Sequence, residues 1–102
     1  MIEPQSPLVI VDDDKITHLL LRKKIQLVEF NSEIKYFSKP GDALDYLKKA
    51  RKSKVVSDLN LEEMEAWDFL DILEKQGFEG QFFLMTFSVS SSDTDLLQIL
   101  EA

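Results

Sequence analysis

Hydrophobic residues in this chain fall into short continuous runs separated by segments with helical spacing. Residues 7–11 and 82–86 are uninterrupted apolar, β-prone runs, as expected for strands that are buried on both faces. Residues 33–37 alternate in polarity, and residues 54–58 form another short β-prone run, so two further strands are predicted there. The chain is therefore expected to contain four strands.

Apolar residues with helical spacing fill the segments between these strands and after the last one. They predict helices over about residues 15–28, 43–47, 67–73 and 95–100. Residues 38–41 provide capping and turn residues, the third helix is expected to end near Gly77, and residues 90–93 resemble a helix cap. Trp67 and Phe69 are expected to be core or half-buried residues. The first helix is apolar over more than half of its circumference, which is more than packing on one sheet requires.

The regular alternation of strand and helix predicts an α/β protein. Connections this short favour a parallel sheet with right-handed crossovers. A chain of 102 residues is long enough for one domain and too short for two. The sequence shows no internal repeat and no linker, so residues 1–102 are expected to form a single domain.

The composition disfavours some classes of binding partner and indicates a cellular compartment. Twelve basic and nineteen acidic residues give a net charge of −7, which disfavours binding to nucleic acid or to anionic membranes. The sequence has no cysteine, no signal peptide and no apolar stretch long enough to span a bilayer. A cytoplasmic protein is expected.

Acidic residues follow two of the predicted strands directly. Asp12, Asp13 and Asp14 come after the first strand and Asp58 ends the third. If these strands are neighbours, the carboxylates converge at the edge of the sheet where open α/β folds bind ligands. Their mutual repulsion would be relieved by a hard divalent cation, and Mg²⁺ fits best because it accepts one or two carboxylates. Asp14 is expected to cap the first helix instead.

The same residues argue against other ligands of α/β sheets. Flavin mononucleotide and dinucleotides require a Gly-rich or Ser/Thr-rich loop after the first strand, where this chain has three aspartates.

His18 is the only histidine, so neither a zinc site nor a catalytic triad is predicted. It is expected to be a surface or packing residue.

Three segments together resemble the receiver domains of two-component response regulators. Residues 8–14 (LVIVDDD) are similar to the first strand and acidic pair of that family. Residues 57–70 (SDLNLEEMEAWDFL) are similar to the segment that begins with its phosphorylated aspartate, and residues 83–86 (FLMT) to its fourth strand and hydroxyl residue. The motifs occur in the family's order, and the resemblance runs from about residue 7 to the end.

The resemblance implies a flavodoxin-like, three-layer, doubly wound parallel sheet with strand order 2-1-3-4. It implies that Asp58 accepts a phosphoryl group from a histidine kinase or a histidine phosphotransfer protein, and that Thr86 binds this group. It further implies Mg²⁺ held by Asp12, Asp13, Asp58 and the backbone carbonyl of Asn60. Such a protein signals by contact with other proteins and is not an enzyme beyond its own phosphorylation and dephosphorylation.

Receiver domains have a fifth strand, which carries a lysine, and a fifth helix, and no segment up to Ala102 corresponds to them. We therefore expect a C-terminally incomplete receiver domain over residues 1–102. The alternative is a pseudo-receiver, a protein-interaction or dimerisation module without phosphotransfer. A homo-oligomer formed through the edge of the strand at residues 82–85 and the adjoining apolar face is also expected. A phosphohydrolase of the haloacid-dehalogenase group is disfavoured, because Asn60 stands where that group needs a second aspartate.

Overall fold

The computed structural model describes residues 7–27, 33–58, 61 and 63–84, which contain four strands and three helices. Their order is β1 (Leu8–Val11), α1 (Lys15–Leu27), β2 (Ile34–Phe37), α2 (Pro40–Leu47), β3 (Lys54–Ser57), α3 (Ala66–Lys75) and β4 (Gln81–Leu84). All of them correspond to predicted elements. The predicted fourth helix at residues 95–100 and its cap lie outside the described residues. Within the described ranges, no helix is long and apolar enough to cross a bilayer.

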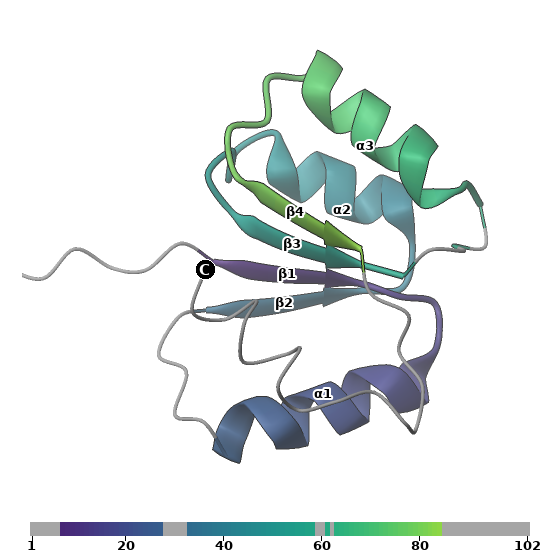
Figure 1. Cartoon of the computed structure of the whole chain (residues 1–102), viewed down its shortest axis with the longest axis vertical. Coiled ribbons are helices and arrows are strands. Elements are labelled where there is room, and N and C mark those ends of the chain that lie inside the picture. The colour runs from purple at the N-terminus through teal and green to yellow at the C-terminus, as the bar shows by residue number, and fades with distance from the viewer. Residues whose placement is uncertain (1–6, 28–32, 59–60, 62, 85–102) are drawn as a thin grey trace, which may run out of the picture.

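The four strands form one parallel sheet in the order β2-β1-β3-β4, as the resemblance implied. Helices α2 and α3 lie on one face of the sheet and α1 lies on the other, which gives three layers (Figure 1). The fold class is therefore flavodoxin-like α/β. In the described part of the chain, β4 lies at one edge of the sheet and β2 at the other.

Alternating side chains of the strands supply the two cores. Val9, Val11 and Val55 point toward α2 and α3, where they pack with Phe69 and Leu73. On the opposite face another cluster joins the sheet to α1, and its buried members are Leu8, Ile10, Leu21, Ile25 and Val56. Because β1 is covered on both sides, all four of its residues are buried, as its continuous apolar sequence predicted.

Two local predictions need correction. Helix α2 begins at Pro40, which was predicted as part of a turn; proline suits the first turn of a helix because the missing N–H has no partner there in any case. Trp67 was expected to be buried or half-buried, but 59% of its surface is exposed, whereas Phe69 is fully buried. Helix α3 begins at Ala66, and its buried residues are Ala66, Phe69 and Leu73, so Trp67 lies off the core-facing stripe.

Backbone hydrogen bonds join the loops at the end of the sheet where the strands begin, which we call the amino end. The N–H of Glu79 donates to the carbonyl oxygen of Arg51 at 2.9 Å, and that of Gln81 donates to Ser53 at 3.2 Å. Helix α3 stops as predicted near Gly77, whose φ of 86° lies in the left-handed region that favours glycine. These bonds fix the start of β4 beside the start of β3.

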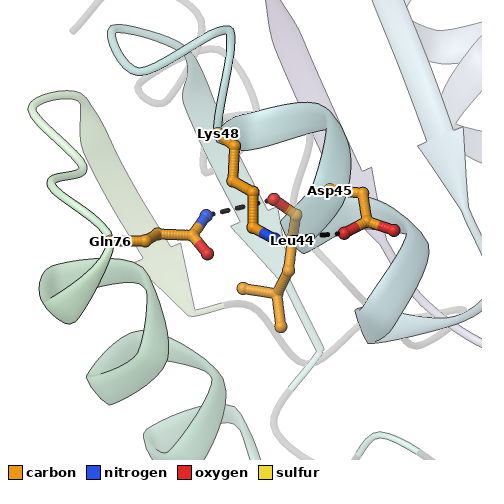
Figure 2. A network of polar contacts seen from close by, with 4 residues as sticks. All are labelled: Leu44, Asp45, Lys48 and Gln76. Atoms are coloured by element: carbon orange, nitrogen blue, oxygen red, sulfur yellow. Dashed lines mark hydrogen bonds and ion pairs between the residues drawn. The ribbon is translucent and has the colours of Figure 1, made fainter.

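A side-chain hydrogen bond also links the end of α3 to α2, the other helix on the same face of the sheet. The Nε2 amide of Gln76 donates to the carbonyl oxygen of Leu44 at 3.0 Å, across 32 residues of sequence (Figure 2). Lys48 lies close by, and its ammonium is 3.6 Å from the carboxylate of Asp45 on the same turn of chain. The Gln76 bond is partly buried, whereas the Lys48–Asp45 pair is exposed to solvent.

Candidate functional site

The pairing of β1 with β3 brings two aspartates together at the opposite end of the sheet, the carboxyl end. Val11 and Ser57 are the last paired residues of the two strands, so the next residues are Asp12 and Asp58. The N–H of Asp58 donates to the carbonyl oxygen of Val11 at 3.1 Å, which continues the ladder one residue past β3. On the other side, the N–H of Asp12 donates to Phe37 of β2 at 3.0 Å. Both aspartates are thus fixed by the sheet itself.

The carboxylates of Asp12, Asp13 and Asp58 form a single cluster. One oxygen of each lies within 4.8 Å of the others. Asp12 is nearly buried, with 2% of its surface exposed, Asp58 is partly buried, and Asp13 is exposed. The cluster therefore opens to solvent at Asp13 and is closed at Asp12. The predicted convergence of these three residues is confirmed.

Asp14 has a different role from Asp12 and Asp13. Its carboxylate accepts the N–H of Ile16 at 2.9 Å, and its carbonyl oxygen accepts the N–H of His18 at 3.3 Å. This is the geometry of an N-cap residue at the start of α1, as predicted. The N–H of Asp14 in turn donates to a carboxylate oxygen of Asp12 at 2.8 Å. The cap thereby holds the Asp12 side chain in place.

Burial and charge act in the same direction on Asp12. The pKa of Asp12 is raised from 3.8 to about 6, mainly because burial removes solvent from its carboxylate and also because the carboxylates of Asp58 and Asp13 lie nearby. The hydrogen bond from the backbone of Asp14 opposes the shift. A carboxylate with such a raised pKa is held ionised at an energetic cost, which a bound cation would remove.

No protein-family model matches the sequence, and no curated protein matches it either. Solved structures do match. The signal receiver domain of an HD domain-containing protein from Pseudomonas fluorescens Pf-5 is 17% identical, with a TM-score of 0.80 over 99% of this chain and 90% of that one.

Two further structures agree with the first. Chemotaxis protein CheY4 of Vibrio cholerae is 16% identical, with a TM-score of 0.71 over 95% of this chain and 97% of that chain. The MaeR response regulator bound to beryllium trifluoride is 20% identical, with a TM-score of 0.69 over 92% of this chain and 75% of that one. This is the fold of response-regulator receiver domains. At these identities the likeness concerns the fold.

On this receiver fold, the acidic cluster has the chemistry of a site for a hard divalent cation. Carboxylate oxygens are the ligands that Mg²⁺ prefers, and the cluster offers three of them within a small volume. Burial is the main cause of the raised pKa of Asp12, and the neighbouring carboxylates add to it, so a cation would favour the ionised form of this residue. The residues present therefore fit a magnesium ion.

Two further predicted site residues of the receiver fold, Asn60 and Thr86, lie outside the described residues. Their roles as a backbone carbonyl ligand and as a phosphoryl ligand stay predictions. Ser57 was not singled out from the sequence, yet it is fully buried next to the site. Its hydroxyl donates to the carbonyl oxygen of Asp58 at 2.9 Å. The sequence offered one signal for this residue, namely a serine near the end of a predicted strand and directly before Asp58.

His18 is a packing residue, as expected. Its ring centroid lies 5.5 Å from that of Tyr36 on β2, and the guanidinium of Arg22 lies 5.3 Å from the same tyrosine ring. Burial lowers the pKa of His18 below its usual value, so the neutral imidazole is favoured. Tyr36 thus anchors two residues of α1 to the sheet.

Proposed function

We propose that the chain is a phosphoacceptor module of a two-component signalling system. In this proposal Asp58 accepts a phosphoryl group from a histidine kinase or a histidine phosphotransfer protein. The observation that supports it is the cluster of Asp12, Asp13 and Asp58 within 4.8 Å, at the carboxyl end of a receiver fold. In a parallel sheet this is the end at which ligands bind.

Asp58 is the nucleophile in the proposed reaction. One of its carboxylate oxygens attacks phosphorus, a new P–O bond forms, the P–N bond to the donor imidazole breaks, and the imidazole leaves with its electron pair. Asp58 is suited to this step because its backbone is fixed by the bond to Val11 and by the Ser57 hydroxyl. A fixed nucleophile loses little freedom when the donor arrives.

Asp12, Asp13 and Asp58, with the backbone carbonyl of Asn60, are the proposed ligands of Mg²⁺. The ion supplies positive charge that offsets the carboxylates and the incoming phosphoryl oxygens. The bond from Asp14 keeps one oxygen of Asp12 occupied and so orients the other. The hydroxyl of Thr86 is proposed to bind the phosphoryl group.

Intact-mass measurement tests the proposal directly. Incubation with a small phosphodonor and Mg²⁺ should add one phosphoryl group to the wild type, and chelation of the metal should prevent the gain. Asp58→Asn should abolish it, whereas Asp68→Asn, which changes an exposed carboxylate on α3, should leave it intact. Beryllium trifluoride, which MaeR binds, offers a second probe that should bind the wild type and not Asp58→Asn. Modification that persists in Asp58→Asn would contradict the assignment.

The second candidate is an interaction module without phosphotransfer. The observation that favours it is the exposure of three large apolar residues on α1, namely Ile16, Leu19 and Leu20. A folded wild type that gains no mass and binds no beryllium trifluoride in the presence of Mg²⁺ would select this candidate.

A further inference from the structure

His18 lies in a contact between α1 and β2 that extends toward the acidic cluster. Its imidazole centroid lies 5.5 Å from that of Tyr36, and the guanidinium of Arg22 lies over the same tyrosine ring. The backbone N–H of His18 donates to Asp14, the cap residue of α1, at 3.3 Å. Helical side chains lean toward the start of their helix, and α1 starts at the carboxyl end of the sheet (Figure 1). The ring of His18 is therefore directed from its packing contact toward the residues that follow β1.

The two nitrogens of this imidazole have different surroundings. The ring hydrogen-bonds to the backbone of Asp12, where the carbonyl oxygen is the acceptor. Nε2 is buried and has no hydrogen-bond partner among the described residues. The bond to Asp12 therefore belongs to Nδ1, which must carry the proton of the neutral ring in order to donate it. A buried Nε2 without a donor costs free energy that a phenyl ring would not, which indicates that Nδ1 is the nitrogen in use.

The bond from His18 fixes the third polar group of Asp12. The N–H of Asp12 donates to Phe37 of β2 at 3.0 Å, and its carboxylate accepts the N–H of Asp14 at 2.8 Å. Its carbonyl oxygen belongs to the planar peptide that leads to Asp13. A bond to this oxygen sets the plane of that peptide and so the direction in which Asp13 leaves the sheet.

We propose that His18 is a positioning residue of the cation site, which holds the Asp12–Asp13 peptide through Nδ1 and keeps the Asp13 carboxylate in the cluster. The Ser57 hydroxyl has the same relation to Asp58, whose carbonyl oxygen it binds at 2.9 Å. Asp13 is the exposed member of the cluster, so without this bond it would lose more conformational freedom when three carboxylates gather around an ion. The proposal rests on the proposed function, because it requires the cation site assigned there.

The tautomer of the wild type tests the bond itself. His18 is the only histidine in the chain, so the imidazole signals of a tag-free, ¹⁵N-labelled sample come from this ring alone. Burial lowers the pKa of His18, so the ring is neutral in mildly alkaline buffer. Spectra that correlate the carbon-bound ring protons with both nitrogens distinguish the two neutral forms. The Nδ1–H form is expected, and the Nε2–H form would overturn the proposal because Nδ1 would then have no proton to donate.

Two substitutions separate the hydrogen bond from the packing. His18→Phe keeps a ring against Tyr36 and removes the donor, whereas His18→Asn removes the ring and keeps an N–H donor near the place of Nδ1. Addition of Mg²⁺, followed by amide chemical shifts, should show an affinity about tenfold lower for His18→Phe and within about threefold of the wild type for His18→Asn. Urea denaturation should give the opposite order, with His18→Asn the less stable variant, because it loses the ring contact with Tyr36.

The opposite orders distinguish positioning from a purely structural role. If the affinity for Mg²⁺ instead follows stability, so that His18→Phe binds as the wild type does, the role of His18 is overturned while the cation site stands. A wild type that binds no Mg²⁺ would overturn the cation site of the proposed function, and the role of His18 with it. Binding that is weakened in His18→Phe and retained in His18→Asn supports both.

Discussion

The two ends of the sheet are built in contrasting ways. At the amino end, loop backbones are joined by hydrogen bonds such as those from Glu79 to Arg51 and from Gln81 to Ser53. At the carboxyl end, three carboxylates lie within 4.8 Å, and the pKa of one of them, Asp12, is raised to about 6. The first arrangement stabilises the fold, and the second opposes it when no cation is present. The fold thus separates the groups that maintain it from the acidic groups that are proposed to bind a cation.

This contrast predicts its largest effect at Gly80, on the amino end. A Cβ atom at this position would overlap the carbonyl oxygen of Ser53 and lie 2.8 Å from the ring of Phe78. Gly80→Ala should therefore lower the free energy of unfolding by about 3 kcal/mol, measured by urea denaturation.

Gly41→Ala provides the matched control. Gly41 lies in the first turn of α2, and a Cβ there would meet no atom within 4 Å. This variant should be more stable than the wild type by about 0.5 kcal/mol, because alanine loses less backbone entropy in a helix. Equal effects of the two substitutions would show that close approach at Gly80 is not the cause.

The next effect concerns pH and Asp12 at the carboxyl end. Its folded-state pKa is raised, so the folded protein binds this proton more tightly than the unfolded chain does. The resulting stability is complete below pH 3.8 and is lost as the pH rises through about 6. With solvent screening allowed for, the metal-free wild type should lose about 1 kcal/mol between pH 5 and pH 7.5.

Asp12→Asn isolates this contribution, because asparagine keeps an oxygen to accept the Asp14 N–H. In chelator-treated samples, the difference in stability between this variant and the wild type should grow as the pH rises. Urea denaturation at both pH values measures it. Parallel pH profiles for the two proteins would mean that Asp12 is not under strain at neutral pH.

The last comparison concerns Gln76, whose bond to Leu44 ties the end of α3 to α2 at the amino end (Figure 2). Gln76→Ala should lower stability by about 1 kcal/mol, since one partly buried hydrogen bond is lost. Lys48→Ala removes an exposed ion pair beside it and should change stability by less than about 0.5 kcal/mol. Thermal denaturation of both variants ranks the two contacts, and a larger loss at Lys48 would reverse this ranking.

Much of the carboxyl end was predictable because it depends on where strands stop. Apolar runs that change abruptly to aspartate mark the ends of β1 and β3, and a parallel sheet brings such ends to one edge. That β1 and β3 are neighbours came from the family resemblance, and the sheet order confirms it. The helix cap at Asp14 followed from local chemistry alone.

The amino end was far less predictable, because its contacts join residues distant in sequence. Nothing near Gln76 indicates that its amide reaches Leu44, and nothing near Gly80 indicates that the Ser53 carbonyl lies against it. Trp67 was misplaced for a related reason: helical spacing alone did not reveal which residues of α3 face the sheet. Close approach of separate segments is a tertiary property that one local pattern does not encode.

The hydrogen bond from Asp58 to Val11 has a consequence for folding. A slip of β3 by one residue along β1 would carry Asp58 about 3.3 Å from its place and turn its side chain to the other face. Only the native alignment then assembles three carboxylates, so affinity for a divalent ion would report that the central strands have paired in register.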